Sequence, residues 1–309
     1  QAEKNGTLPK IVMPVHFAGQ PCDMPAIHAL SKKYKFKIIE DASHAIGASY
    51  SAIIEDQHTS VIETSGVMQH SSLPLVTARS GEVAARQSTS TKVGSCAHSH
   101  ITVFSFHPVK IITTGEGGMA LTNDATLASR LRRLRTHGIT VDKELMHFRP
   151  ENEIWNYQQI ELGFNYRMTD IQAALGLNQI QRLDKFLIHR HKIAAKYDIE
   201  LRSLPITTPN QSPKIYSSYH LYPIRINENE NGKMQRQIYD SLWQSGVAAN
   251  LHYIPAHRQP YYEKLGFNAG DYPVSEQFHR EVISLPMYPT LETEEQAAVI
   301  KALFKALSL

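Results

Sequence analysis

Short apolar runs alternate with amphipathic stretches at the start of the chain. The run at 11–15 predicts a buried strand, and a second strand is predicted at 37–40. Between them, apolar residues recur at helical spacing from Asp23, a typical N-cap, to Tyr34. Strand, helix and strand in this order predict a βαβ unit with parallel strands and a right-handed crossover.

The same alternation continues through the middle of the chain. Strands are predicted at 101–104 and 119–122, and the leucines of 127–134 share one face of a helix that Gly138 ends. Thr169 is the expected cap of one long helix that reaches to about Leu201. Helices and parallel strands in alternation indicate an α/β domain.

A second, smaller domain is predicted after this helix. Pro205 and the Pro/Ser/Asn stretch at 208–213 mark a boundary, so we expect domains at 1–204 and 205–309. The predicted elements of the second domain are a Tyr-rich strand at 216–226, a helix around 238–243 ended by Gly246, a strand at 250–254, and a final helix from Thr293 with a capping box to Gln296.

Residues 51–90 interrupt the pattern. Twelve of these forty residues are Ser or Thr, none is aromatic, and no periodicity persists. This composition predicts a flexible, solvent-exposed insertion within the first domain.

Composition narrows the class of protein. The 309 residues are 42% hydrophobic and 20% charged, which is typical of a soluble globular chain with room for two domains. The net charge of +3 is too small for a nucleic-acid or membrane partner, and no apolar run is long enough to span a membrane. Two cysteines, Cys22 and Cys96, cannot form a disulfide framework and favour a cytoplasmic location.

The residues most suggestive of chemistry follow two predicted strands. Lys110 lies after the 101–104 strand, between Ser105 and the Gly-rich turn at 113–118, which suits a nucleophilic amine beside a phosphate site. Asp41 comes directly after the 37–40 strand, where ligands bind in α/β sheets. A lysine that forms a Schiff base and an aspartate that pairs with a ring nitrogen are what pyridoxal phosphate requires.

Other candidate sites are weaker. Cys96, His98 and His100 alternate along the chain but lack the paired spacings of zinc sites, so we predict no metal centre. The arginines of 130–135 are expected on the solvated face of an amphipathic helix, and no Walker or Rossmann glycine motif precedes a helix. Hydrolysis of nucleoside triphosphates and NAD-dependent chemistry are therefore disfavoured.

These motifs together resemble the pyridoxal-phosphate-dependent sugar aminotransferases of the DegT/DnrJ/StrS group. The resemblance runs from about Pro9 to the C-terminus, apart from the insertion. It is carried by the stretches at 14–20, 38–50, 101–123, 137–140, 162–177, 252–267 and 284–289. It implies the fold type I architecture, here as a partial large domain with a mostly parallel sheet and a small C-terminal α+β domain.

The resemblance also implies roles for individual residues. Lys110 would be the catalytic lysine that binds pyridoxal phosphate and moves the proton, and Asp41 would pair with the ring nitrogen. His44 would lie near the ring and its hydroxyl, and Ser105 would bind the phosphate. Asn165 would reach the phosphate of a neighbouring subunit, so a homodimer with shared sites is expected. His252 and Tyr253 would line the pocket of the sugar nucleotide.

The reaction implied is a ping-pong transamination. Lys110 favours it, since related sugar dehydratases of this fold carry His at that position. The branch that the chain resembles most takes an amino group, expected from glutamate, to the C4 keto group of a UDP-linked 4-keto-6-deoxy-N-acetylhexosamine, on the route to pseudaminic acid. Two alternatives stay open: an aminotransferase for a dTDP-linked keto sugar, and a non-catalytic remnant with a structural or interaction role.

Two features depart from the family pattern. Removing 51–90 restores nearly the usual spacing between Asp41 and Lys110. The family's N-terminal segment, which supplies a phosphate-binding helix N-terminus and an aromatic residue that stacks on the ring, is missing from the 309 residues, which begin with Gln1. We therefore expect this chain alone to bind pyridoxal phosphate weakly.

Overall fold

The structure is a computed structural model that describes residues 2–51, 90–148, 153–227 and 232–307. Apart from its two end residues, the insertion predicted at 51–90 lies outside the described residues. In the described part of the chain, no helix is long and apolar enough to cross a membrane.

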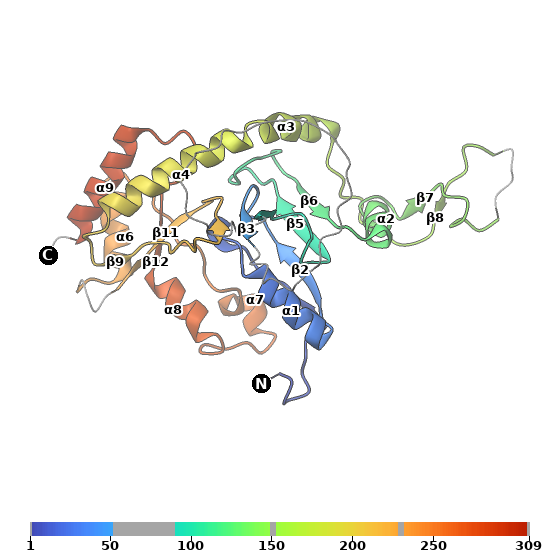
Figure 1. Cartoon of the computed structure of the whole chain (residues 1–309), viewed down its shortest axis with the longest axis horizontal. Helices are drawn as coiled ribbons and strands as arrows, with labels where there is room; N and C mark the ends of the chain where they lie inside the picture. Colours follow the sequence, from blue (N-terminus) through green and yellow to red (C-terminus); the bar gives the residue numbers. More distant parts are fainter. Residues whose placement is uncertain (1, 52–89, 149–152, 228–231, 308–309) are drawn as a thin grey trace, which may run out of the picture.

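A four-stranded sheet forms the centre of the N-terminal half (Figure 1). Its strands, in spatial order, are β1 (Ile11–Val12), β2 (Lys37–Asp41), β5 (Ile101–Ser105) and β6 (Gly118–Leu121). The first three strands are parallel, and β6 is antiparallel to β5. The predicted βαβ unit is confirmed, because α1 (Met24–Tyr34) connects the parallel pair β1 and β2.

Local sequence signals explain where α1 begins and ends. The Asp23 carboxylate accepts a hydrogen bond from the Ala26 amide at 3.1 Å, as expected of an N-cap. The helix ends at Lys35, which adopts the left-handed conformation. The strand predicted at 11–15 is regular only through Val12, although Val15 forms an isolated bridge to Asp41. This bridge keeps the chain beside the carboxyl end of β2.

A two-stranded ribbon projects from the body beyond α2 (Ala125–Leu134) (Figure 1). The ribbon consists of β7 (Ile139–Thr140) and β8 (Gln158–Gln159). Arg133 of α2 donates from Nε to the Glu161 carboxylate at 2.6 Å and joins the helix to the return strand.

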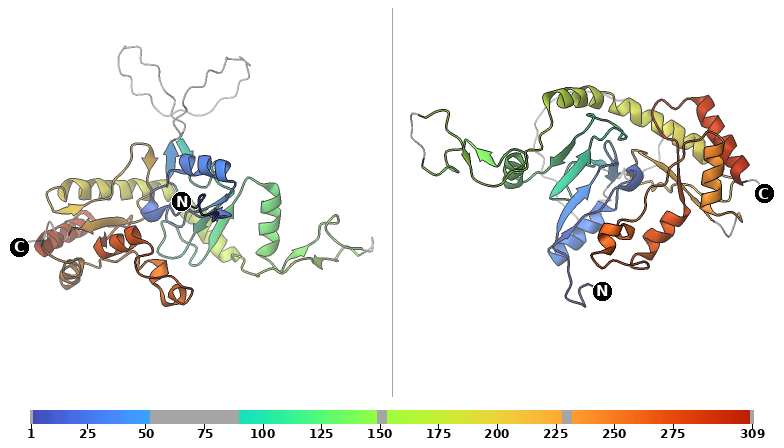
Figure 2. Two further views of the ribbon diagram at one scale, coloured as in Figure 1. Left: turned by 90° about the horizontal axis from the view of Figure 1, so that it is seen from below. Right: turned by 180° about the vertical axis from the view of Figure 1, so that it is seen from behind.

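The single long helix predicted from Thr169 is in fact two helices. Thr169 caps α3 (Asp170–Ile180) with the capping-box pattern, and α4 (Leu183–Glu200) follows after a short break. The apolar spacing changes just before this point, because Leu175 and Ile180 are five positions apart where a continuous stripe needs three or four. The views of Figure 2 show α4 lying across both halves of the molecule.

The C-terminal half is built on a second sheet with the strand order β12-β11-β9. Its elements are β9 (Ile206–Thr207), β11 (Tyr222–Ile226), α6 (Gln235–Gln244), α7 (Pro260–Glu263), α8 (Pro273–Glu281), β12 (Val282–Leu285) and α9 (Thr293–Leu307). The helix predicted around 238–243 is confirmed as α6, and the final helix begins at Thr293 as predicted.

Three predictions for this half were wrong in detail. The strand predicted at 216–226 is divided, because β10 (Ile215–Tyr216) pairs with β3 (Ser49–Ser51), which also pairs with β4 (Ser90–Lys92). A left-handed residue, Tyr219, separates β10 from β11. The strand predicted at 250–254 is a single bridge from Asn250 to Ser284. The Gln296 side chain donates to the Ile193 carbonyl of α4 at 2.8 Å rather than closing a capping box.

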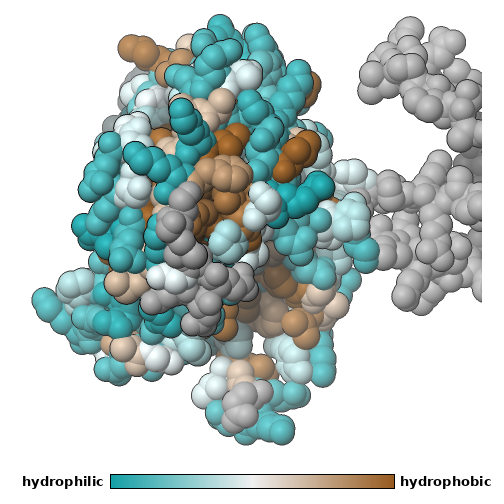
Figure 3. All heavy atoms as spheres, turned by 90° about the vertical axis from the view of Figure 1, so that its left-hand side faces the viewer, coloured by the Kyte–Doolittle hydropathy of each residue, from teal (hydrophilic) through white to brown (hydrophobic). Residues whose placement is uncertain are grey.

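The described residues form two hydrophobic cores, one in the N-terminal half and one in the C-terminal half. The first packs α1 against the four-stranded sheet around Met24, Ile38 and Phe104. The second packs β11, β12, α6 and α9 together and includes Ile193 and Tyr197 from the second half of α4. Figure 3 views the C-terminal end, where hydrophilic side chains surround a central hydrophobic patch.

Candidate active site

The carboxyl ends of β2 and β5 bring the predicted cofactor residues to one edge of the sheet. Asp41 is the last residue of β2, and Lys110 lies in the turns that follow β5. Both side chains are half-buried. Burial lowers the pKa of Lys110 and the charge of Asp41 partly opposes that effect, so the two groups face each other electrostatically. The fold thus brings the two predicted residues to the same edge of the sheet, and their roles toward a cofactor stay predictions.

His44 lies in the turn after β2 and is almost fully buried. Its Nδ1 accepts a hydrogen bond from the Ala18 amide at 3.3 Å, and its Nε2 lies 3.3 Å from the Tyr253 hydroxyl. Because the amide can only donate, the neutral ring carries its hydrogen on Nε2. Burial and the charge of Lys110 lower the pKa of His44 to about 4. His44 is therefore a neutral imidazole at physiological pH.

The C-terminal half supplies the other wall of this cluster. His252 holds its Nδ1 2.8 Å from the Ser284 hydroxyl, and burial together with Lys110 lowers its pKa. The Tyr253 hydroxyl lies 3.3 Å from Nε2 of His44, and the Tyr253 ring makes an edge-to-face contact with Phe17. Five of the seven predicted site residues thus meet here: Asp41, His44, Lys110, His252 and Tyr253.

Ser105 and Asn165 are placed differently. Ser105 ends β5, and its hydroxyl accepts a hydrogen bond from the His107 amide at 3.4 Å. Asn165 is exposed in the segment before α3, with a left-handed backbone, and its amide donates to the Thr136 carbonyl at 2.8 Å. Asn165 shares no contact with Lys110 or Asp41 in the described part of the chain, and its predicted role toward a neighbouring subunit stays a prediction.

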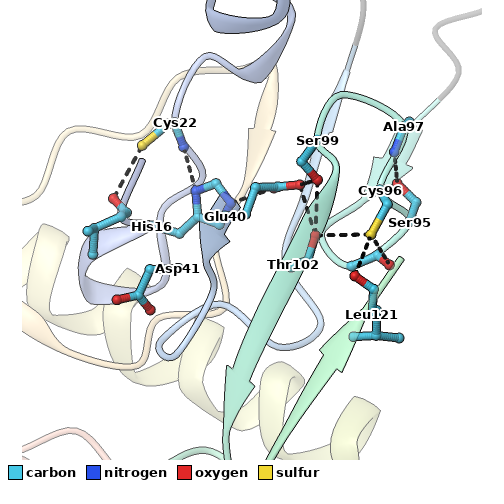
Figure 4. A network of polar contacts seen from close by, with 12 residues as sticks. His16, Cys22, Glu40, Asp41, Ser95, Cys96, Ala97, Ser99, Thr102 and Leu121 are labelled. Carbon is cyan, nitrogen blue, oxygen red and sulfur yellow. Dashed lines mark hydrogen bonds and ion pairs between the residues drawn. The ribbon is translucent and has the colours of Figure 1, made fainter. Parts of the chain in front are cut away.

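A buried polar network supports Asp41 from the opposite side (Figure 4). Glu40 and His16 are fully buried, and their carboxylate and Nε2 are 2.8 Å apart. Ser99 and Thr102 donate to the other carboxylate oxygen of Glu40. Burial raises the pKa of Glu40, but these hydrogen bonds outweigh it and hold the pKa below its ordinary value. Figure 4 shows Asp41 pointing away from this network.

The network also fixes the backbone at Asp41. The His16 amide donates to the Asp41 carbonyl at 3.0 Å, and the Asp41 amide donates to the Pro14 carbonyl at 2.9 Å. Sequence reasoning did not identify His16 and Glu40 as parts of the site. The available signal was Glu40 itself, a charged residue two positions after Ile38 and therefore on the same face of the predicted strand as that apolar residue.

His220 is a second residue that sequence reasoning missed. It is buried, and its ring centroid lies 4.3 Å from that of His44. Burial, His44 and Arg190 together hold the pKa of His220 far below its ordinary value, so it too is neutral. No local pattern marks His220, because only the tertiary fold brings it to the site.

The residues at this edge fit the pyridoxal phosphate that the sequence resemblance implies. A half-buried amine of lowered pKa can attack an aldehyde, and a carboxylate faces the same space. A neutral imidazole and a tyrosine hydroxyl complete the surroundings. Lys110 would hold the cofactor covalently, and Asp41 would pair with its ring nitrogen.

Comparisons with known proteins agree with this geometry. A family model described as the DegT/DnrJ/EryC1/StrS aminotransferase family matches residues 3–304. The UDP-4-amino-4,6-dideoxy-N-acetyl-beta-L-altrosamine transaminase of Campylobacter jejuni is 31% identical over 98% of this chain. The chain spans 65 to 67% of the length of the curated relatives that it matches.

Solved structures show the same fold. Helicobacter pylori PseC, an aminotransferase involved in the biosynthesis of pseudoaminic acid, superposes with a TM-score of 0.75 at 27% identity, over 97% of this chain and 67% of its own. DesV of S. venezuelae, solved in complex with a ketimine intermediate, also superposes with a TM-score of 0.75 at 27% identity. The match covers 99% of this chain and 68% of DesV. The chain has the fold type I architecture and belongs to the DegT/DnrJ/EryC1/StrS family of pyridoxal-phosphate-dependent sugar aminotransferases.

Proposed function

We propose that the chain transfers an amino group from glutamate to the C4 keto group of a UDP-linked 4-keto-6-deoxy-N-acetylhexosamine, in the formation of a pseudaminic acid precursor. The observation that carries the proposal is the half-buried Lys110 facing Asp41 at the carboxyl edge of the sheet. The relatives support this choice of substrate, because the C. jejuni protein is named a transaminase of a UDP-linked 4-amino sugar, and the H. pylori protein is described as an aminotransferase of pseudoaminic acid biosynthesis.

In this proposal Lys110 acts as a nucleophile and as a proton carrier. When bound, pyridoxal phosphate supplies an electron sink that lets a proton leave one carbon and return to another. Burial lowers the pKa of Lys110, so a larger share of its amine is uncharged near neutral pH than for an exposed lysine. The Lys110 amine therefore takes up and returns the proton in each half-reaction.

The remaining residues orient and shield the site. The hydrogen bonds to Pro14 and His16 fix the backbone of Asp41, and the Ser43 amide orients its carboxylate by donating to Oδ1 at 3.0 Å. His44 is neutral and adds no positive charge near Lys110, so it does not oppose protonation of the amine. Its Nε2–H donates toward the Tyr253 oxygen, which leaves the hydroxyl hydrogen of Tyr253 free to donate to a substrate oxygen.

A groove beside this cluster is the proposed site of the sugar. It has a volume of about 920 Å³ and a mostly apolar lining. Its walls include Phe17, His252, Tyr253, Tyr272 and Phe278. A concave apolar site with a few convergent polar groups is typical of small-molecule binding. His252 and Tyr253 line the groove, and Tyr253 also contacts His44, so the groove adjoins the edge at which Lys110 lies.

A homodimer is part of the proposal. Helix α3 buries none of its residues, and Ile171 and Leu177 are 85% and 68% exposed. Leu162, Phe164 and Tyr166 just before it are exposed as well. Apolar surface of this extent is unusual on a monomer, and Asn165 lies within it. We propose that a second copy covers this surface, which would bring Asn165 to the partner's phosphate site. A cytoplasmic location also stays a prediction.

The substrate is tested by supplying the purified chain with glutamate, a panel of UDP- and dTDP-linked keto sugars, and saturating pyridoxal phosphate, because weak cofactor binding is expected of this chain. We expect mass spectrometry to show an amino sugar only from the UDP-linked 4-keto-6-deoxy-N-acetylhexosamine, with the Lys110→Ala variant as the inactive control. Amination of a dTDP-linked sugar instead would replace the proposed substrate. Amination of none, with adduct formation at Lys110 also absent, would favour a structural role.

A further inference from the structure

Arg190 is a buried cation at the centre of α4. The residue is only 3% exposed, and the two hydrogens of its Nη1 are shared among three backbone carbonyls within hydrogen-bond distance. These belong to Tyr219 at 2.9 Å, His220 at 3.1 Å and Met287 at 3.0 Å. Within the described ranges, Arg190 forms no ion pair with an acidic side chain. Burying a guanidinium without a counter-ion is unfavourable. The hydrogen bonds to the three carbonyls must therefore offset this cost, and they hold the backbone segments that carry these carbonyls in place.

Two of the three carbonyls that Arg190 binds, those of Tyr219 and His220, come from a kinked segment, residues 217–221. Tyr219 has φ of 45°, a left-handed conformation that is unfavourable for a residue with a side chain. The carbonyls of Tyr219 and His220 both accept from the same nitrogen of Arg190. The guanidinium therefore stabilises the kink directly, and through Met287 it ties the kink to the end of the second sheet.

The same segment reaches the candidate active site. The Ser218 hydroxyl donates to the His44 carbonyl at 2.8 Å, and the His220 ring packs on the His44 ring. The Leu221 amide donates to the carbonyl of Ala18, whose own amide holds Nδ1 of His44. The backbone, the ring and the Nδ1 atom of His44 thus all depend on residues 217–221.

We propose that Arg190 is a positioning residue that holds the His44 imidazole in the active site by fixing the kink at residues 217–221. The proposal deepens the proposed function, because it takes His44 as a cofactor-side residue. The physical link from Arg190 to His44 does not depend on which substrate is used. Figure 1 shows α4 lying above β11, the strand that follows residues 217–221.

Several groups face His44 and set its ionisation. Burial is the largest influence, and the charges of Lys110 and His252 also disfavour the imidazolium, whereas Asp41 favours it. The His220 ring and the Tyr253 hydroxyl close the remaining sides. If the kink relaxed, the His220 ring would withdraw and water would reach His44. The imidazolium would then be better solvated, and the pKa of His44 would rise toward 6.5.

This link is tested on the chain without cofactor, by NMR titration of histidine side chains labelled with ¹⁵N, with His44 assigned by its Gln variant. The test variant is Arg190→Met, which keeps the apolar length and removes the donors. We expect the His44 midpoint to rise by about one pH unit or more. Arg190→Lys, whose ammonium has three donors, should give a smaller rise. Arg182→Met, an exposed change at the start of the same helix, should leave the midpoint unchanged.

An unchanged His44 midpoint in a folded Arg190→Met variant would overturn the proposal. Should that variant not fold, Ser218→Ala serves in its place, because it leaves Arg190 intact and removes the hydroxyl that donates to the His44 carbonyl and, at 3.4 Å, to the Gly19 carbonyl. A rise in the same direction supports the link, and no rise contradicts it. A shifted His44 in a protein that forms no adduct at Lys110 would count against the proposed function alone.

Discussion

His16 and Glu40 are fully buried and are joined, Nε2 to carboxylate, at 2.8 Å directly behind the residue that faces Lys110. His16 belongs to the segment at 14–20 and Glu40 belongs to β2. The pair therefore holds together the two backbone segments that position Asp41. Removing one partner of such a pair leaves the other uncompensated in the interior. The pair therefore connects stability of the sheet with geometry of the site.

Glu40→Ala should destabilise the protein by about 3 to 5 kcal/mol, because His16, Ser99 and Thr102 would all lose their acceptor. Glu40→Gln keeps an oxygen acceptor at the same place and should cost much less. The free energy of unfolding from urea titration followed by circular dichroism measures both. Equal losses of unfolding free energy in the two variants would show that the hydrogen bonds to the Glu40 side-chain oxygens do not stabilise the fold.

Acid should weaken the same interaction. The pKa of Glu40 is lowered in the folded protein from its ordinary value of 4.5, so the folded state binds this proton less readily than the unfolded state. The stabilisation is therefore complete above that ordinary value and is lost as pH falls through the folded pKa. Melting temperature measured from pH 6 to pH 3 should fall less steeply in Glu40→Gln than in the natural chain. Parallel curves would contradict this assignment.

Gly19→Ala should disturb the contact between Gly19 and residues 217–221, where the two halves of the molecule meet. A Cβ there would lie 2.5 Å from the Ser218 hydroxyl oxygen and 2.8 Å from the His220 nitrogen, at a φ of +95°. We expect a loss of about 2 kcal/mol or more, from strain and from displacement of residues 217–221. Gly266→Ala is the matched control, since its φ is +98° and nothing lies within 4 Å of the added Cβ. Equal losses would mean that backbone strain alone is responsible.

Asp41 should control the ionisation of Lys110. Burial lowers the pKa of Lys110 below 10.5, and Asp41 is the group that opposes this. Asp41→Asn should therefore lower the pKa of Lys110 further, whereas Asp142→Asn on the exposed segment after β7 should not change it. NMR of reductively ¹³C-methylated lysines across a pH series reports these values. A rise in the pKa of Lys110 in Asp41→Asn would contradict the facing arrangement.

Charge on α3 should separate the proposed dimer. Ile171→Glu would place a carboxylate at the centre of the apolar surface, and desolvating it in an interface is unfavourable. Sedimentation velocity should show a monomer for Ile171→Glu and a dimer for the natural chain. Ile199→Glu, at an exposed site near the end of α4, is the control and should stay dimeric. A dimer in both variants would place the interface elsewhere.

Local signals in the sequence predicted the parts of the fold that depend on neighbouring residues. Short stretches of chain were enough to predict the cap at Asp23, the parallel pairing of β1 with β2, and the position of Asp41 and Lys110 at or just beyond the carboxyl ends of their strands. The division of the 169–201 helix was visible only as an irregular apolar spacing. Propensity alone did not reveal it.

The features that were missed depend on contacts between distant segments. Arg190 meets carbonyls 29, 30 and 97 positions away along the chain, and His220 reaches His44 only through the kink at Tyr219. Such contacts leave no periodic trace in the sequence. The strand predicted at 250–254 was wrong for the same reason: only Asn250 pairs with β12, and His252 and Tyr253 instead extend to the active site.

The central claim is that Lys110 is the residue that carries pyridoxal phosphate. The most direct measurement incubates the chain with saturating pyridoxal phosphate, reduces with borohydride and locates the adduct by peptide mass spectrometry. We expect a pyridoxyl group on Lys110 in the natural chain and none at any single site in Lys110→Ala. Labelling scattered over the exposed lysines, with Lys110 unmodified, would contradict the claim.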